Sequence, residues 1–471
     1  MKIIIFGVGR YLENRYNLIK KYFKAKDIVA FIDNKIENGQ CGKFKNNPVY
    51  SPPYIKKVCY DYILIASTYY DEMKSQLLEM GVDNKKIILL EKYCKIKEKG
   101  ILKLDIVKNC YKRKRVLFLS NTMYYDGASL AVVYAARAID KEKYEVTIAV
   151  PSIQEELLNK IKKSAVNVII CPSLPYVDAT EMYWIKTFDI AIVNTFQNIQ
   201  MVCEISKVIP VLWWIHEPGK TYHALYENTI RIFNEYNDEE KFINARIATV
   251  TRWAADAFEQ YYPNRVDTIM PLGIPDERIN GYKPYIERTI GFITLGSVSE
   301  IKGQDVLVEA INMLPREISN KACFYIVGHC NDRDKFVYGV KKKTMKMSNV
   351  VFTGTLSRND LKELFNKIDV VVCASREETL SIAVIEGMMY GKVCITTDAT
   401  GVADFIHDDV DGFVVQSNNP FELAKKIGYV IQNISNLDDM RNSARNVYEK
   451  HFSMKVFENR LELEMKQLLM V

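Results

Sequence analysis

The sequence lacks any long hydrophobic run, and this absence narrows what the 471-residue chain can be. No apolar stretch approaches the roughly 18 residues that a membrane-spanning helix needs. The opening KIIIF has the length of a strand and not the pattern of a signal peptide. The ten cysteines include no Cys-x-x-Cys pair, and several lie in or beside apolar runs. We therefore expect a cytoplasmic protein with reduced thiols, without disulfides or a zinc site.

The chain also lacks a strong charge of one sign. Its 64 basic and 58 acidic residues leave a net charge of +6. This mild excess suits an anionic substrate or a membrane surface, and it is too small to indicate nucleic-acid binding. A hydrophobic content of 48% indicates a globular protein, and the length suits about three domains at roughly 150 residues each.

Residues 1–92 have the pattern of a small α/β unit. KIIIFGVGRYLEN predicts a strand, a glycine turn and the start of a helix. Further strands are expected at VAFIDNK, YDYILIAS and KIILL. Strands that alternate with helix-length patterns indicate a parallel sheet. We therefore predict a Rossmann-like N-terminal module.

The glycine turn of this module has part of a dinucleotide-binding fingerprint. Gly7 and Gly9 supply two of its three glycines, Leu12 occupies the third position, and Asp33 is placed to meet a ribose hydroxyl. Two interpretations stay open. The module either binds a nucleotide or nucleotide sugar, or it is a packing unit in which these glycines only make a turn.

A lysine- and arginine-rich segment follows, and residues 93–112 are predicted to be a basic linker. We expect solvated chain with helical content, and the alternative is a basic face for anionic lipid headgroups at the inner membrane surface.

A second α/β series then begins, in which seven strands are expected: RVLFLS, VTIAV, NVII, DIAIVNT, VLWWIHE, ARIATVT and VDTIM.

The stretch DVVVCASREETLSIAVIEGMMYG, residues 369–391, is the strongest candidate for a site. It predicts a buried strand, a polar loop and a helix, which together expose backbone N–H groups that can hold an anion. Glu378 precedes the helix, and Glu386 follows inside it after seven intervening residues. Carboxylates accept hydrogen bonds from sugar hydroxyls, so the stretch offers what a nucleotide sugar needs. Just upstream, Ser357 and Asp360 predict a helix cap.

The spacing of these two glutamates resembles the signature of family 4 retaining glycosyltransferases. The resemblance implies that Glu386 binds the ribose and that Glu378 contacts the transferred sugar. The amides of the four following residues would face the diphosphate: Thr379, Leu380, Ser381 and Ile382. Lys302 and Gly303 align with the Lys-Gly pair that family members place at the diphosphate. Gly354 would lie in the loop that borders the nucleobase.

The same resemblance assigns residues near the acceptor. The small-residue loop with Gly127, Ala128 and Ser129 would lie against the donor phosphate and the acceptor. His216 would lie beside the transferred sugar, and Glu217 near the acceptor. His216, Glu378 and Lys302 are therefore the expected catalytic residues. Ser297 stands where the family usually carries an arginine, so one expected phosphate cation is missing.

The fold implied by the resemblance is GT-B, an α/β architecture of two Rossmann-like domains that face each other across a cleft, here after the smaller third module. We expect an acceptor domain at 113–285, a donor domain at 286–455, and a C-terminal helix at 456–471 that packs back on the acceptor domain. The segment from Gly273 to Arg288 would be the hinge. The module itself resembles the N-terminal half of bacterial sugar acyltransferases.

The implied reaction transfers a sugar, with retention, from a UDP- or GDP-sugar to a glycan or lipid-linked acceptor in bacterial surface polysaccharide synthesis. No metal and no cofactor are expected, because Lys302 and the helix amides would neutralise the phosphates. One alternative is a nucleotide-sugar epimerase or hydrolase, which would use His216 with Glu217. Another is a non-catalytic partner subunit of a glycosyltransferase complex, which Ser297 favours.

Overall fold

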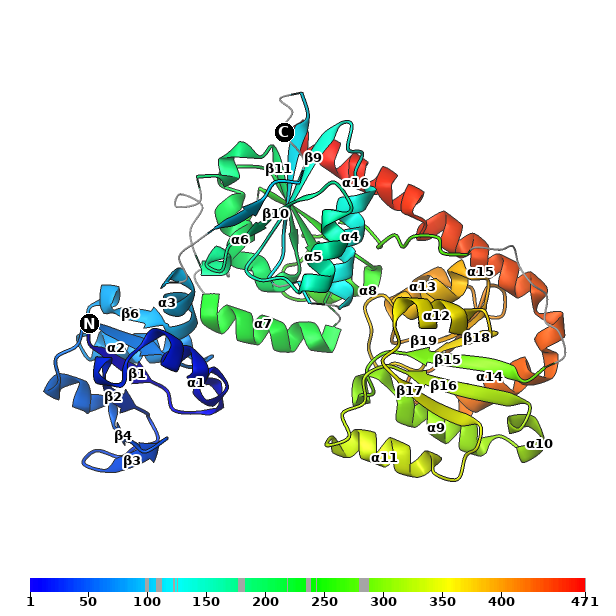
Figure 1. Ribbon diagram of the computed structural model, residues 1–471, viewed down its shortest axis with the longest axis horizontal. Coiled ribbons are helices and arrows are strands. Elements are labelled where there is room, and N and C mark those ends of the chain that lie inside the picture. Colours follow the sequence, from blue (N-terminus) through cyan, green and yellow to red (C-terminus); the bar gives the residue numbers. More distant parts are fainter. Residues whose placement is uncertain are drawn as a thin grey trace. The chain divides into compact units, whose positions relative to one another are not determined.

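The computed structural model contains three β-sheets with helices against them (Figure 1). It describes residues 1–97, 101–106, 112–121, 123–124, 126–176, 183–217, 219–233, 239–242, 244–278 and 288–470. By internal contacts the chain divides into two compact units. The first unit comprises Met1–Tyr124, Glu145–Val211 and His223–Ala245. The second comprises Tyr125–Tyr144, Leu212–Tyr222 and Arg246–Val471.

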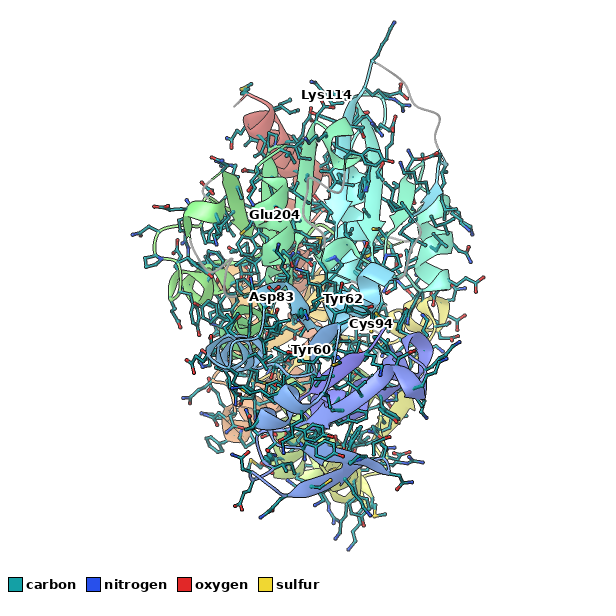
Figure 2. All side chains as sticks on the ribbon, turned by 90° about the vertical axis from the view of Figure 1, so that its left-hand side faces the viewer. Tyr60, Tyr62, Asp83, Cys94, Lys114 and Glu204 are labelled. Atoms are coloured by element: carbon teal, nitrogen blue, oxygen red, sulfur yellow. The ribbon has the colours of Figure 1, made fainter. Side chains whose placement is uncertain are left out.

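The N-terminal module forms a six-stranded sheet in the order β3-β4-β2-β1-β5-β6. All its pairings are parallel except the one between β3 and β4. Its strands are β1 (Ile3–Phe6), β2 (Ile28–Ile32), β3 (Cys41–Phe44), β4 (Asn47–Tyr50), β5 (Tyr62–Ile65) and β6 (Ile87–Leu89). Its helices are α1 (Arg10–Tyr22), α2 (Tyr70–Glu79) and α3 (Leu90–Lys97). Cys94 of α3 is fully buried in a core cluster against which Tyr62 also packs (both labelled in Figure 2).

The second sheet has eight strands in the order β14-β13-β12-β11-β8-β9-β10-β7. These strands are β7 (Leu102–Leu104), β8 (Lys114–Leu119), β9 (Tyr144–Val150), β10 (Asn167–Ile170), β11 (Ile190–Asn194), β12 (Val211–Ile215), β13 (Ala245–Thr249) and β14 (Thr268–Ile269). The helices of this segment are α4 (Gly127–Ala138), α5 (Glu155–Lys162), α6 (Ile199–Ile205), α7 (Gly219–Phe233) and α8 (Arg252–Glu259).

The third sheet has six parallel strands in the order β17-β16-β15-β18-β19-β20. They are β15 (Ile290–Leu295), β16 (Ala322–Val327), β17 (Val350–Gly354), β18 (Val370–Cys373), β19 (Val393–Thr397) and β20 (Phe413–Val415). The helices are α9 (Gln304–Met313), α10 (Arg316–Ser319), α11 (Lys335–Thr344), α12 (Arg358–Phe365), α13 (Ile382–Met389), α14 (Pro420–Asn433), α15 (Asp438–His451) and α16 (Met454–Leu469). α16 packs against α4 within the second compact unit.

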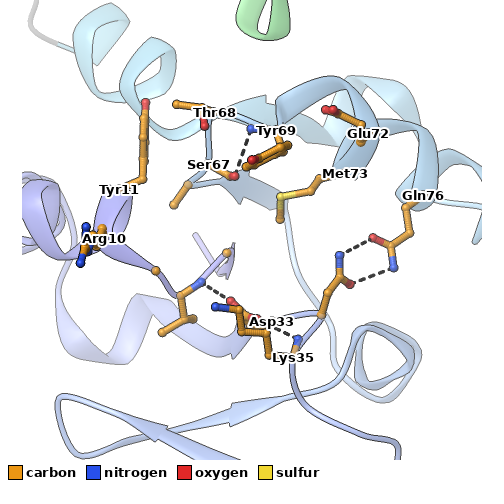
Figure 3. Close-up of a pocket in the computed structure, with 15 residues that line it drawn as sticks. Arg10, Tyr11, Asp33, Lys35, Ser67, Thr68, Tyr69, Glu72, Met73 and Gln76 are labelled. Carbon is orange, nitrogen blue, oxygen red and sulfur yellow. Dashed lines mark hydrogen bonds between the residues drawn. The ribbon is translucent and has the colours of Figure 1, made fainter. Parts of the chain in front are cut away.

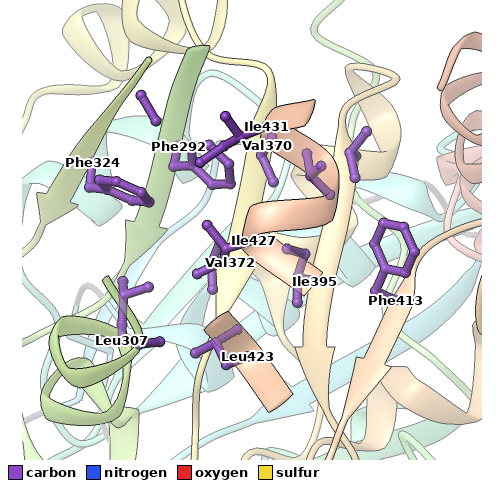
Figure 4. Packing of buried hydrophobic residues seen from close by; sticks show 14 of the residues in the cluster. Phe292, Leu307, Phe324, Val370, Val372, Ile395, Phe413, Leu423, Ile427 and Ile431 are labelled. Atoms are coloured by element: carbon purple, nitrogen blue, oxygen red, sulfur yellow. The ribbon is translucent and has the colours of Figure 1, made fainter. Parts of the chain in front are cut away.

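A continuous apolar core fixes the third sheet. Helix α14 lays Leu423, Ile427 and Ile431 over the central strands (Figure 4), and all three side chains are buried. Phe292 and Phe324 stack on neighbouring strands with ring centroids 4.8 Å apart. Burying one such side chain contributes about 1.5–3 kcal/mol, so this layer holds the strand ends, and the loops that follow them, in place.

The structure confirms the predicted α/β fold class and strand pattern, and it adds elements that the sequence pattern did not predict. The hairpin β3–β4 turns through Lys45 and Asn46, which both have positive φ. The segment predicted as a linker with helical content supplies the end of α3, but residues 102–104 also form β7, which pairs antiparallel with β10. Residues 98–100 and 107–111 of that segment lie outside the described residues, as do 279–287 of the predicted hinge.

None of the helices in the described part of the chain is long and apolar enough to cross a membrane.

Candidate functional site

The strand order of the third sheet brings two loops together. β15 and β18 are neighbours, and the chain visits β16 and β17 on one side before it returns to β18. At such a reversal, the loops after the two strands open a crevice in which ligands bind. Gly303, in the loop after β15, has φ +66°, and a Cβ on it would lie 2.0 Å from the carbonyl oxygen of Ala374, just after β18. Only glycine allows the two loops to approach this closely.

Lys302 and Glu378 meet at this point. The Lys302 Nζ donates to Glu378 Oε1 at 2.7 Å, and Ser375 Oγ donates to Glu378 Oε2 at 3.0 Å. Burial acts to lower the pKa of Lys302, but the Glu378 carboxylate outweighs it, and the pKa lies above its ordinary value. The lysine is therefore a fixed positive charge, and Glu378 is a fixed acceptor beside it.

The N-terminus of α13 lies directly after Glu378. Ser381 is its N-cap, and the Ser381 side chain makes no capping hydrogen bond. The backbone continues through Thr379, Leu380 and Ile382, and the first helical hydrogen bond runs from Ile385 N to Ser381 O. The amides of the first turn are thus not consumed by a side-chain cap. Together with Lys302, they give the site the electrostatics of an anion site.

Glu386 lies one turn into α13 and is part of an ion-pair cluster. Arg358, the first residue of α12, donates through Nη1 to Glu386 Oε1 at 2.5 Å and through Nη2 to Glu277 Oε2 at 2.7 Å. Lys362 lies 3.3 Å from the other Glu277 oxygen. Burial raises the pKa of Glu386, and the guanidinium opposes that rise. The carboxylate expected at the ribose is therefore oriented by an arginine that the sequence pattern did not identify.

A second arginine fixes the loop that carries Glu378. Arg376 binds Asp305 through two parallel bonds of 2.8 and 2.7 Å and also donates to the Glu300 carbonyl at 2.6 Å. Its own amide donates to Ile301 O at 2.7 Å. The backbone amide and the guanidinium of Arg376 thus both hold the polar loop against the segment that carries Lys302. A bidentate pair of this kind adds geometric specificity.

Two loops near the second sheet also reach this region within the same compact unit. A Cβ on Gly127 would meet Ile382 Cδ1 at 3.7 Å, and a Cβ on Gly219 would meet Glu377 Oε1 at the same distance. Gly127 and its neighbour Ala128 therefore begin α4 beside the first turn of α13. The Ser129 amide, however, is taken by the carboxylate of Asp126 at 2.8 Å, so this donor of the loop is already satisfied.

His216 follows β12 and is partly buried against Trp214, with ring centroids 4.4 Å apart. Its Nε2 is buried and has no hydrogen-bond partner among the described residues. Burial lowers the pKa of His216 to about 3, so the ring is neutral at physiological pH. Its backbone amide donates to the carboxylate of the buried Glu217 at 3.0 Å. The neutral ring has one N–H donor and one acceptor nitrogen, and it carries no positive charge.

The remaining predicted residues lie elsewhere. Gly354, with φ +68°, accepts a hydrogen bond from Gly328 N at 3.0 Å at the end of β17, and no hydrogen bond among the described residues joins it to Lys302 or Glu378. Gly7, Gly9 and Asp33 lie in the N-terminal module. Among the residues that the structure describes, no group of three histidine, cysteine or acidic side chains is arranged to hold a metal ion.

The module has a cavity of about 500 Å³ at the carboxyl ends of β1, β2 and β5 (Figure 3). Asp33 Oδ2 accepts from Val8 N at 2.6 Å, and Oδ1 accepts from Lys35 N at 2.9 Å. Gly7 has φ +101°, and a Cβ there would lie 2.9 Å from Ala66 O. The sheet order reverses between β1 and β5, so the cavity lies where α/β sheets place ligands.

Comparison with known proteins bears on the fold of the chain. Residues 284–447 match the family described as glycosyl transferases group 1, and residues 1–88 match a family described as C2185-like, N-terminal. The solved structure of HepE from Anabaena, in complex with UDP and glucose, superposes with a TM-score of 0.63 at 16% identity. The superposition covers 75% of this chain and 100% of that one. The chain has the GT-B fold.

Curated relatives match parts of this GT-B chain. An uncharacterized glycosyltransferase of Methanocaldococcus jannaschii is 24% identical over 229 residues, which is 48% of this chain and 54% of the relative. The lipopolysaccharide glucosyltransferase WaaG of Escherichia coli is 26% identical over 175 residues, which is 34% of this chain and 45% of the relative. The chain therefore spans about half the length of the curated relatives it matches.

The sequence analysis did not identify four residues that contact Lys302, Glu378 or Glu386 or hold their loops: Ser375, Arg358, Glu277 and Arg376. Ser375 and Arg376 lie inside the recognised stretch, where a polar loop between strand and helix could have suggested them. Glu277 is 81 residues from Arg358 along the chain, and no local pattern joins them.

Proposed function

We propose that the chain is a glycosyltransferase that moves a sugar from a nucleoside diphosphate sugar to an acceptor hydroxyl with retention of configuration. The observation that carries the proposal is the Lys302–Glu378 pair, 2.7 Å apart, beside the uncapped start of α13. A cation and free amides suit a diphosphate, and a carboxylate suits sugar hydroxyls. The group 1 match over 284–447 and the UDP in the HepE structure support the same donor class.

In the proposed reaction, the bond between the anomeric carbon and the diphosphate oxygen breaks while the acceptor oxygen bonds to that carbon on the same face. The acceptor proton passes to the departing phosphate oxygen. Lys302 and the α13 amides stabilise the negative charge that develops there. Neutral His216 hydrogen-bonds the transferred sugar, and Glu378 fixes its hydroxyls. Because the charge is met by these groups, we propose a reaction without a metal ion or cofactor.

The acceptor is proposed to be a glycan or lipid-linked sugar in bacterial surface polysaccharide synthesis. Two curated relatives support this class by their names: WaaG, a lipopolysaccharide glucosyltransferase, and a poly(ribitol-phosphate) alpha-N-acetylglucosaminyltransferase of Staphylococcus aureus. The net charge of +6 suits work at an anionic surface, so we further propose a cytoplasmic enzyme that contacts the inner membrane peripherally.

The decisive experiment incubates the full chain with radiolabelled UDP- and GDP-sugars and lipid-linked acceptors. Transfer of label to the acceptor with an unchanged anomeric configuration supports the proposal. Release of free epimerised or hydrolysed sugar would support the epimerase or hydrolase instead. Binding without turnover, unaffected by Glu386→Ala, would indicate a non-catalytic partner subunit.

A second binding function is proposed for the N-terminal module, namely a nucleotide or nucleotide sugar in the cavity of Figure 3. The glycine turn, Asp33 and the reversal of strand order support it. The test uses the full chain with Glu386→Gln, so that the donor site is weakened. Gly9 has φ −128° and a Cβ there would meet nothing within 4 Å, so Gly9→Glu adds a carboxylate without a backbone clash.

Calorimetry with UDP and UDP-sugars should show residual binding in this background. Gly9→Glu should abolish that binding, whereas Gly9→Ala, the matched control, should keep the fold and most of the affinity. No residual binding in the Glu386→Gln background would identify the module as a packing unit.

A further inference from the structure

A charge-balanced cluster surrounds the carboxylate that is expected to bind the ribose. Glu386 of α13 and Glu277, in the segment after β14, each bind one side of the Arg358 guanidinium at 2.5 and 2.7 Å. Lys362, one turn further along α12, lies 3.3 Å from Glu277. Two carboxylates and two cations therefore sum to zero charge. Glu386 has a buried side chain, 7% exposed, and it depends on Arg358 for its counter-charge.

The two carboxylate oxygens of Glu386 differ in their hydrogen bonds. Oε1 accepts from Arg358 Nη1, and no hydrogen bond among the described residues involves Oε2. A carboxylate held at one oxygen by a rigid fork keeps its second oxygen in a defined direction. That second oxygen is the acceptor left for a ligand hydroxyl.

Glu277 has a role of its own in this arrangement. Arg358 begins α12, and its guanidinium would be free to swing if only Glu386 held it. The bond to Glu277 fixes the other side of the fork. Glu277 is itself anchored, since its backbone N lies 3.2 Å from Met389 Sδ of α13. The arginine is thus clamped between α13 and the segment after β14.

We propose that Arg358, clamped by Glu277, is a positioning residue for the nucleotide, which orients Glu386 and supplies its counter-charge so that Oε2 accepts the ribose hydroxyls. The inference rests on the proposed donor-binding function. Charged and titratable groups around Glu386 are Arg358 of α12, Glu277 of the segment after β14 and Tyr390 of its own helix. Arg358 is the one cation among these three.

Loss of Arg358 therefore has a specific signature. Burial already favours the protonated form of Glu386, and the guanidinium opposes it. Without the arginine, the pKa of Glu386 should rise further, so a larger share of the carboxyl is protonated and loses acceptor capacity. Ribose binding should then weaken at neutral pH and recover as the pH rises and the proton leaves. A loss of general packing would not give such a pH dependence.

The test measures the dissociation constants of UDP and GDP by calorimetry between pH 5.5 and 8.5 on four variants of the full chain: Arg358→Gln, Arg358→Lys, Glu386→Gln and Arg445→Gln. Arg445 is the matched control, because it ties the neighbouring Asp276 to the Met389 carbonyl without touching Glu386. Far-UV circular dichroism and melting curves report folding.

Arg358→Gln should weaken the better-bound nucleotide roughly tenfold or more at pH 7, in line with the loss of a charged hydrogen bond, and the affinity should rise with pH. Arg358→Lys keeps the charge and should restore the flat pH profile, with only a small loss of affinity. Glu386→Gln should bind weakly at every pH, and Arg445→Gln should bind as the wild type does.

Two results would overturn the inference in distinguishable ways. If Glu386→Gln loses binding while Arg358→Gln and Arg358→Lys bind as the wild type does at every pH, Arg358 does not position the nucleotide, and the donor site stands. If the wild-type chain binds neither UDP nor GDP, the proposed function fails and the inference fails with it. Should Arg358→Gln not fold, Glu277→Gln takes its place, because it removes the second partner of the guanidinium. Weakened nucleotide binding by Glu277→Gln supports the inference, and wild-type binding overturns it.

Discussion

Replacing Lys302 with methionine tests the proposed donor site most directly. The change keeps most of the length of the side chain and removes the ammonium that lies 2.7 Å from Glu378. Removing one preorganised donor from a developing oxyanion costs roughly 10²–10³ in kcat. The loss of stability should be smaller, at most about 1.5–3 kcal/mol for a charged hydrogen bond, because Ser375 still satisfies the second oxygen of Glu378 at 3.0 Å. We therefore expect a folded chain with kcat reduced about 100- to 1000-fold.

The assay measures initial rates of sugar transfer at saturating donor, with whichever acceptor the labelled-donor experiment identifies. Lys341→Met is the matched control in the same domain. Its partner Asp332 is also 2.7 Å away, but both side chains are exposed, at 38% and 76%. An exposed pair contributes about 0–1 kcal/mol, so kcat should stay unchanged. A Lys302→Met chain that keeps more than a tenth of the wild-type kcat would refute the role of Lys302 at the leaving diphosphate.

Three further predictions follow from the geometry. Gly303→Ala should lower the free energy of unfolding in urea by more than the roughly 1–2 kcal/mol that a left-handed residue costs, because its Cβ would clash with Ala374 O. The control is Gly81→Ala, whose φ is +84° and whose Cβ would point into open space, so it should show only that smaller cost. Equal costs for the two variants would contradict the reasoning. The pKa of His216 is about 3 in the folded chain and has its ordinary value of 6.5 in the unfolded chain. Between these values only the unfolded chain takes up the proton, so the melting temperature should fall as the pH drops from 6.5 towards 3. His216→Asn should flatten that decline. Burial acts to raise the pKa of Asp305, but Arg376 lowers it overall. The pair therefore stabilises the fold above the unfolded pKa of about 3.9, and it loses that contribution as the pH falls. The difference in urea midpoint between the wild type and Asp305→Asn should accordingly disappear in acid.

Local signals predicted most of the fold. The strand-length runs of the first two sheets and the strand within residues 369–391 were recognisable. The Ser357–Asp360 cap is confirmed, since Ser357 Oγ accepts from Asp360 N at 3.2 Å. The hairpin β3–β4 was missed because its turn residues, Lys45 and Asn46, both adopt positive φ without the glycine that usually marks such a turn. Strand β7 was missed because it is short and lies in a lysine-rich segment.

Only two kinds of site residue could be predicted from the sequence: those that lie in the stretch 369–391 and those that the family resemblance assigns. Lys302 and Glu378 are 76 residues apart, and their contact depends on β15 and β18 being neighbours. The family resemblance assigned both residues to the donor without predicting their contact, and it did not identify Arg358. An arginine at the start of a helix has the same local pattern whether it faces solvent or a buried carboxylate. What decides is the tertiary position of Glu386, 28 residues away.

The module and the donor domain follow the same geometric rule, and their difference shows why that rule alone does not define a site. In both sheets a glycine with positive φ brings the loop after a central strand against the neighbouring strand where the order reverses. In the third sheet, that approach places the partly buried Lys302 against the Glu378 carboxylate, at the proposed donor site. In the module, Asp33 accepts from two backbone amides instead. The nucleotide proposed for the module would therefore bind through the remaining lone pairs of Asp33 and through the other groups that line the cavity, and we expect it to bind more weakly there than at the proposed donor site.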